Sequence, residues 1–192
     1  MGNGSNGILV NGDDNLIGGL IAHAQRNVIS GNGTQGIYIT SGDGNQIVNN
    51  FIGTTADGMS ALNNGSGVYV NGTGNIIGGK GEIRLPNVIS GNTGYGVRIN
   101  SSPDNIVWGN IIGATRDPRL PLGNGGDGIE VLGDASGTQV GGIGYQEPNI
   151  IANNGLQGVL LQDNIAGEPV SNTVRGNAIY NNELLGIDLG GD

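Results

Sequence analysis

The feature that most constrains this chain is a repeat of about 30 residues. A segment of the form Gly-[Ile/Val]-x-[Val/Ile/Leu] recurs with successive spacings of 29, 31, 29, 32, 30 and 28 residues. Its copies begin at Gly7, Gly36, Gly67, Gly96, Gly128, Gly158 and Gly186. Self-similarity at a period of roughly 20 to 50 residues indicates an architecture in which each repeat packs mainly on its neighbours.

Each repeat contains two further short aliphatic segments. The first of them places its aliphatic residue two positions after an Asn or Thr, at Ile17, Ile47, Ile77, Val107, Val140 and Val174. The second reads Asn-x-Ile in all six repeats, at Ile29, Ile52, Ile89, Ile112, Ile151 and Ile179. A unit of this size cannot bury its apolar side alone, so stacked units must align these columns into one continuous core.

Glycine and asparagine separate the aliphatic segments. The chain has 41 Gly and 27 Asn among 192 residues, a composition that disfavours long helices. One Asn column runs through Asn15, Asn45, Asn75 and Asn105, and another through Asn32, Asn64, Asn92, Asn124, Asn154 and Asn182. Asn tolerates left-handed backbone angles, and stacked amides hydrogen-bond to one another. We therefore expect these residues to turn the corners and to form amide ladders.

These patterns predict an all-β fold, a right-handed parallel β-helix solenoid of about six coils of roughly 30 residues with three short strands each. We expect residues 1–192 to form a single solenoid without obvious end caps, with its three sheets facing solvent. Longer loops are expected on two edges, between the second and third strands at 18–26, 78–86 and 141–148, and after the third strand at 54–63 and 114–123.

Charge and hydropathy exclude several partners. The net charge is −9, and the seven Lys and Arg residues are scattered, which argues against nucleic acid binding. The apolar runs are too short to span a membrane, so no membrane insertion is expected. The chain has no cysteine and hence neither a disulfide framework nor a thiolate metal site.

The phrases Asn27-Val-Ile-Ser-Gly-Asn32 and Asn87-Val-Ile-Ser-Gly-Asn92, with Phe51-Ile-Gly-Thr54, resemble the right-handed parallel β-helix repeats of large exported bacterial proteins. The resemblance covers the whole chain and implies an extracellular or cell-surface location. The same repeat serves adhesins, surface stalks, phage spikes and polysaccharide-cleaving enzymes. Open core ends would invite self-association, including end-to-end fibres.

Catalytic motifs are incomplete. Polysaccharide hydrolases of this fold resemble one another in an Asp cluster, a Gly-His-Gly and an Arg-x-Lys, and this chain lacks the last two. His23 is expected to be a solvated loop residue. Asp13 and Asp14 could bind Ca²⁺ with Asp43 one coil further on, or simply form a polar turn. We assign no catalytic residue, no metal ligand and no cofactor.

Four outward positions are candidates for ligand binding: Tyr38, Tyr69, Arg98 and Trp108. Tyr38 should stack on Tyr69, and Arg98 should pair with Glu130, contacts that would stabilise the sheet. The same residues could instead form a platform for a polysaccharide. Trp108 has glycines at the equivalent positions of the neighbouring repeats, so its indole is expected to be exposed on at least one face.

Two classes of function follow. The preferred interpretation is a non-enzymatic structural or adhesive module of an exported or surface protein that stacks end to end into fibres. The alternative is a carbohydrate-active enzyme, either a polysaccharide lyase or a hydrolase, or else a glycan-binding fragment.

Overall fold

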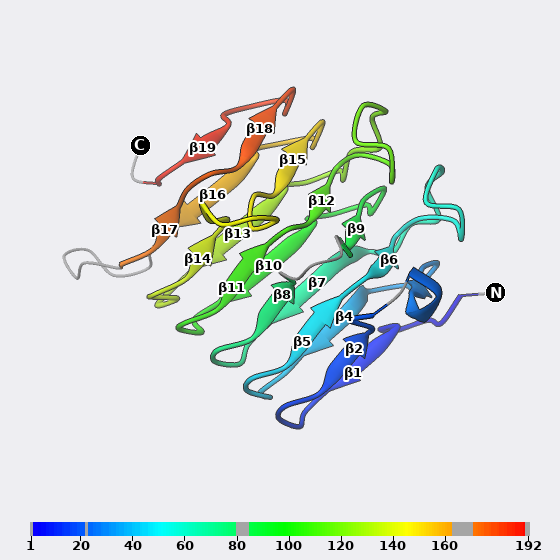
Figure 1. The fold of residues 1–192 in the computed structure, drawn as a ribbon, viewed down its shortest axis with the longest axis horizontal. Helices are drawn as coiled ribbons and strands as arrows, with labels where there is room; N and C mark the ends of the chain where they lie inside the picture. The colour runs from blue at the N-terminus through cyan, green and yellow to red at the C-terminus, as the bar shows by residue number, and fades with distance from the viewer. Residues whose placement is uncertain (1, 22, 80–84, 163–170, 191–192) are drawn as a thin grey trace.

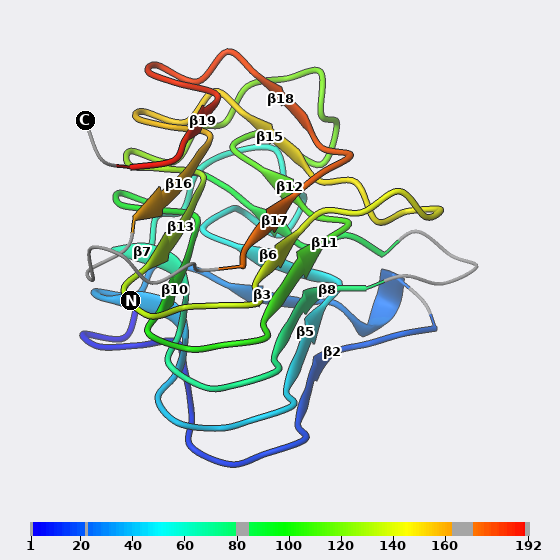
Figure 2. The ribbon, with the colours of Figure 1, turned by 90° about the vertical axis from the view of Figure 1, so that its left-hand side faces the viewer.

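A computed structural model describes residues 2–21, 23–79, 85–162 and 171–190. Over this part the chain winds around one axis, and each turn contributes a strand to each of three sheets (Figures 1 and 2). All pairings between the strands described are parallel. The prediction of an all-β parallel solenoid is therefore confirmed.

The first sheet has seven strands, β1 (Ile8–Val10), β4 (Gln35–Ile39), β7 (Ser66–Val70), β10 (Val97–Asn100), β13 (Ile129–Leu132), β16 (Val159–Gln162) and β19 (Ile187–Asp188). The second has six, β2 (Leu16–Gly18), β5 (Gln46–Val48), β8 (Ile76–Gly78), β11 (Ile106–Trp108), β14 (Gln139–Val140) and β17 (Thr173–Val174). The third also has six, β3 (Asn27–Ile29), β6 (Asn50–Ile52), β9 (Val88–Ile89), β12 (Ile111–Ile112), β15 (Ile150–Ala152) and β18 (Ala178–Tyr180). A 3-10 helix, η1, covers His23–Gln25.

Residues at equivalent positions of successive repeats pair with one another. In the second sheet Ile47 pairs with Ile17 on one side and with Ile77 on the other. In the third sheet Ile89 lies between Ile52 and Ile112. The repeat in the sequence is thus a geometric winding in which like residues lie over like.

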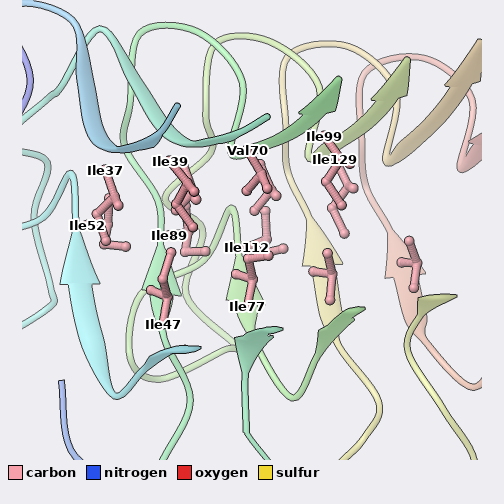
Figure 3. Packing of buried hydrophobic residues seen from close by; sticks show 14 of the residues in the cluster. Ile37, Ile39, Ile47, Ile52, Val70, Ile77, Ile89, Ile99, Ile112 and Ile129 are labelled. Carbon is pink, nitrogen blue, oxygen red and sulfur yellow. The ribbon is translucent and has the colours of Figure 1, made fainter. Parts of the chain in front are cut away.

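The core lies inside the winding, where the aliphatic columns of the three sheets meet (Figure 3). Along the first sheet inward and outward positions alternate, so Ile37 and Ile39 are fully buried and Tyr38 between them is half-exposed. At roughly 25 cal/mol for each Å² of apolar surface removed from water, these columns supply the main stabilising contribution to the fold.

Amide ladders run along three corners of the solenoid, the two predicted from the Asn15 and Asn32 columns and a third that begins at Asn27. At one corner Asn50 donates to Asn87 and Asn87 donates to Asn110 through their side-chain amides, at 3.1 and 2.9 Å. Most ladder amides in the middle of the solenoid also donate to a main-chain carbonyl, as Asn87 does to Ile47 at 2.8 Å. Full burial of these polar side chains is tolerated because their donors and acceptors are paired.

The expectation that the Asn residues of the Asn15 column adopt left-handed backbone angles is wrong, because the left-handed residue is the one before each of them. Asn15, Asn45, Asn75 and Asn105 have ordinary backbone angles, and the positive φ belongs to the residue before each of them, Asp14, Gly44, Gly74 and Asp104, at 55, 65, 65 and 58°. The side chain of the ladder Asn points into the corner. The sharp turn of the backbone is therefore made by the residue before it. Gly or Asp occupies that position because both tolerate the left-handed region.

Loops gather on the two predicted edges. The loops at 54–63 and 114–123 are each closed by an antiparallel bridge, Thr54 with Ala61 and Ala114 with Pro121. They also touch each other, since the Arg116 N–H donates to the Gly58 carbonyl at 3.0 Å. Among the residues described, no helix is long and apolar enough to cross a membrane.

Candidate functional site

The outer face of the first sheet carries three of the four predicted ligand-binding residues. Strands β4, β7 and β10 align Tyr38, Tyr69 and Arg98 in register, one in each of three successive turns. All three side chains are partly exposed, because their inward neighbours occupy the core. The sequence therefore places these residues correctly along one column.

The two tyrosines stack as predicted. Their ring centroids lie 4.9 Å apart, and the rings are within 6° of parallel. The Asn71 amide donates to the Tyr38 hydroxyl at 3.1 Å. Because each ring uses one face against the other, the stacked pair is not a broad aromatic platform with both ring faces free.

Tyr95 is a third aromatic member of this site that sequence reasoning missed. Its ring lies edge-on to Tyr69, with centroids 6.3 Å apart, and it is only 7% exposed. The Arg98 guanidinium covers it at 4.0 Å from the ring centroid. The sequence feature that could have identified Tyr95 is its position directly before the repeat glycine Gly96. The equivalent positions of two earlier repeats carry Gln35 and Ser66, which are also polar.

Arg98 forms the predicted ion pair with Glu130 in the next turn. Partial burial of Arg98 acts to lower its pKa, but the hydrogen bond to Glu130 and the charge of that carboxylate outweigh burial and raise the pKa above its usual value. Glu130 is only 5% exposed, so the pair neutralises a carboxylate that is largely removed from water.

Asp127 adds a second buried carboxyl group to this cluster. It is 4% exposed, accepts the Gln157 N–H at 2.8 Å and shares a hydrogen bond with Glu130. Burial raises the pKa of the Asp127 carboxyl to about 6. The hydrogen bond and the charge of Glu130 also raise this pKa, whereas the hydrogen bond from the Gln157 N–H lowers it. Between about pH 4 and pH 6, Asp127 therefore retains a proton that an ordinary aspartate has already lost.

We expect Asp127 to make the fold less stable as the pH rises from about 4 to about 6. The pKa of Asp127 is about 6 in the folded chain and about 4 when unfolded. Through this window the unfolded chain binds fewer protons than the folded chain, so raising the pH favours unfolding. Measuring the denaturation midpoint from pH 4 to pH 8 for the native chain and for Asp127→Asn isolates the contribution of this carboxyl.

The Asn side chain still accepts the Gln157 N–H but does not titrate. The variant should therefore lose the midpoint decrease that Asp127 causes, while pH effects that do not depend on Asp127 remain. Asp188 faces the same cluster, because its carboxylate accepts from the Gln157 amide at 3.2 Å. Identical pH profiles for the two proteins would contradict the raised pKa of Asp127.

Trp108, the fourth predicted residue, lies elsewhere and is not exposed. It ends β11 in the second sheet beside Gly78, and it is only 9% exposed. The prediction that this indole is exposed is therefore wrong, and the loop that follows Gly141 passes beside the end of β11. The Gly109 N–H donates to the Glu147 carbonyl at 3.0 Å, which brings this loop against the residue that follows the indole.

The proposed calcium ligands have a structural role at a corner. The Asp13 carboxylate accepts the Asp43 N–H at 2.9 Å, and the Asp43 carboxylate accepts the Thr73 N–H at 2.7 Å. These bonds correspond to the polar-turn alternative. Within the described ranges, no group of three or more His, Asp or Glu residues could hold a metal ion. The side chain of His23 lies outside the part that the structure describes.

Comparison with known proteins agrees with this architecture. A family model described as a right handed beta helix region matches residues 1–192. No curated protein and no solved structure matches the chain. The match identifies the handedness and class of the winding, and it assigns no chemistry to the residues on its surface.

Proposed function

The chain belongs to the right-handed β-helix family, and on that premise we propose that it acts as a non-enzymatic structural or adhesive module of an exported or surface protein. The observation that carries this proposal is the unbroken stacking of core and amide ladders over the described turns. Such a winding is a rigid rod, because bending it would open both the ladders and the core.

The amide ladders have a direction that favours end-to-end stacking. Along the Asn27 and Asn32 columns the side-chain amides donate toward the next turn, as Asn27 does to Asn50 at 2.9 Å. The oxygen of Asn27 faces the open side of the first turn, where the described residues provide no donor. At the other end Asn177 donates to the Val140 carbonyl, and no described turn follows to accept its second hydrogen. One end therefore offers acceptors and the other offers donors.

The two ends of the solenoid also expose apolar surface, which favours the same end-to-end contact. In the last turn Ile187 and Leu189 are 44% and 72% exposed, and Val174 and Ile179 are only partly buried. At the first turn two open hollows border the end of the core, one lined in part by Ile8 and Ile29 and the other in part by Val10 and Ile17. A second copy can seat its β1 on β19, so that the column of the first sheet continues across the junction.

We expect the chain to form linear assemblies whose length increases with concentration. The double variant Ile187→Lys/Leu189→Lys should remain monomeric, because it places two charges in the apolar end. Leu120→Lys, a similarly exposed leucine in the 114–123 loop, should assemble like the native chain. Light scattering and negative-stain microscopy provide the measurement, and a native chain that stays monomeric at high concentration would overturn the stacking proposal.

A polysaccharide panel tests the module against its enzymatic and glycan-binding alternatives. The module predicts no turnover of acidic or neutral polymers, followed as new reducing ends and unsaturated products. Turnover or binding of one polymer that disappears in Tyr38→Ala, Tyr69→Ala or Arg98→Ala would instead favour the carbohydrate-active alternative.

A further inference from the structure

Eight asparagines of this chain are followed directly by glycine. Such a pair is a reactive setting for the asparagine side chain, because glycine leaves the next main-chain nitrogen free of steric cover. That nitrogen can then attack the side-chain carbonyl carbon, which the covalent chain keeps close to it. The fold decides which of the eight can react. They are Asn3, Asn6, Asn11, Asn32, Asn64, Asn71, Asn124 and Asn154.

Five of these pairs are held by the winding itself. In each of them the glycine N–H donates to a main-chain carbonyl of the adjacent turn, as Gly65 does to Asn32 at 3.1 Å. The ladder asparagines among them also have their side chains paired, as Asn64 is with Asn92 at 3.0 Å. Reaction at these pairs requires the corner to open first. The five glycines are Gly7, Gly33, Gly65, Gly125 and Gly155.

Two of the other three pairs are held in different ways. The Asn3 amide donates to the Asn32 side-chain oxygen at 2.8 Å and so belongs to a ladder. The Asn71 amide donates to the Tyr38 hydroxyl at 3.1 Å. Gly72 is buried, and a Cβ added to it would lie 1.9 Å from a carbonyl oxygen of the adjacent turn. The main chain at Gly72 therefore has little room to move toward the Asn71 side chain.

The pair Asn11–Gly12 differs from all the others. Both residues are exposed at the corner that follows β1. Among the residues that the structure describes, none accepts a hydrogen bond from the Gly12 N–H. The Thr40 hydroxyl donates to the Asn11 side-chain oxygen. This bond polarises the Asn11 carbonyl group and would stabilise the negative charge that develops on its oxygen when the carbon is attacked.

We propose that Asn11 is a site of spontaneous deamidation, with water as the co-reactant. The Gly12 main-chain nitrogen forms a bond to the Asn11 side-chain carbon and gives up its proton. The bond from that carbon to the amide nitrogen breaks, and the nitrogen leaves with a proton as ammonia. Water then opens the cyclic imide at one of its two carbonyl groups, which yields aspartate or isoaspartate. Thr40 acts as a positioning residue in the first step.

The product changes the corner in charge and in length. It adds a carboxylate near Asp13, Asp14 and Asp43, which are exposed at the same corner. In isoaspartate the main chain runs through the side chain and gains one carbon atom. Asn11 directly follows β1, the strand that end-to-end stacking would use, but the reaction itself does not depend on stacking.

Peptide mapping by mass spectrometry tests the site in the whole chain, incubated in mildly alkaline buffer. The same chain unfolded in urea gives the reference rate for each of the eight pairs. We expect Asn11 to react in the folded chain within about tenfold of its unfolded rate, because its corner is already exposed. Asn64 and Asn124 should react at least about a hundredfold more slowly than when unfolded, because several hydrogen bonds must open first. Asn71 occupies the equivalent corner position and should also be slower than Asn11.

Thr40→Val tests the hydroxyl donor, and Thr34→Val is the matched control, because the Thr34 hydroxyl donates to Asn6 at 2.5 Å and not to Asn11. We expect Thr40→Val to slow deamidation of Asn11 about fivefold in the folded chain, as for loss of one hydrogen bond. It should leave the rate in urea unchanged, and Thr34→Val should change neither rate. An Asn11 that reacts no faster than Asn71 in the folded chain would overturn the proposal. An unchanged or faster rate in folded Thr40→Val would overturn the role of Thr40.

Discussion

Replacing Ile89 with Asp should abolish folding of the chain. Ile89 is fully buried in β9, between Ile52 and Ile112 of the adjacent turns. The substitution loses about 1.5 to 3 kcal/mol of side-chain burial and places in the core a carboxyl group that must be desolvated or protonated without a partner. Desolvation of an unpaired ion costs several kcal/mol more. Because typical folds are stable by only about 5 to 15 kcal/mol, the variant should show no cooperative unfolding transition by circular dichroism.

The matched control is Leu9→Asp. Leu9 occupies an outward position of β1 and is 56% exposed, so the new carboxylate would remain in water. This variant should unfold within about 1 kcal/mol of the native chain. A normally folded Ile89→Asp protein would mean that the inward and outward columns are assigned to the wrong faces.

The second large effect is expected from Asn87→Ala. The Asn87 side chain accepts from the Asn50 main-chain and side-chain N–H groups at 2.9 and 3.1 Å, and donates to the Ile47 carbonyl and to Asn110 at 2.8 and 2.9 Å. All of these groups lie in the buried corner, so truncation leaves several of them without a partner. At about 1 kcal/mol or more for each lost bond, we expect destabilisation of about 3 to 6 kcal/mol in chemical denaturation.

Asn27→Ala provides the control at the exposed end of the same ladder. Its amide donates to Asn50 at 2.9 Å, and water can replace that contact. The expected loss is about 1 kcal/mol or less. If the two substitutions were equally destabilising, the buried ladder would not be the source of the effect.

The sequence predicts the winding because the repeat is a direct record of stacking. Ile17, Ile47 and Ile77 recur every 30 residues, and equivalent residues of successive turns are direct neighbours in the sheets. The Tyr38–Tyr69 stack and the Arg98–Glu130 pair follow from the same register. Contacts along a column can therefore be predicted by aligning the repeats.

Contacts between a column and the loops or side chains beside it cannot be predicted from the repeat length. Trp108 is buried on a side where a loop passes, and loop paths differ from turn to turn. Phe51 is hidden for a similar reason, because Arg26 lies over its ring and Gly58 of the 54–63 loop lies close to it. The raised pKa of Asp127 depends on burial beside Glu130, which no spacing rule reveals.

The central claim, that each repeat is one turn stacked directly on the last, is tested most directly by paired spin labels. The chain has no cysteine, so Leu9→Cys/Leu160→Cys and Leu9→Cys/Asp188→Cys place labels only on outward positions of the first sheet. These pairs are five and six turns apart, which at about 4.8 Å per turn predicts backbone separations of about 24 and 29 Å. Pulsed electron paramagnetic resonance should show the second distance longer by about one turn. A second distance that equals or falls below the first would contradict the account.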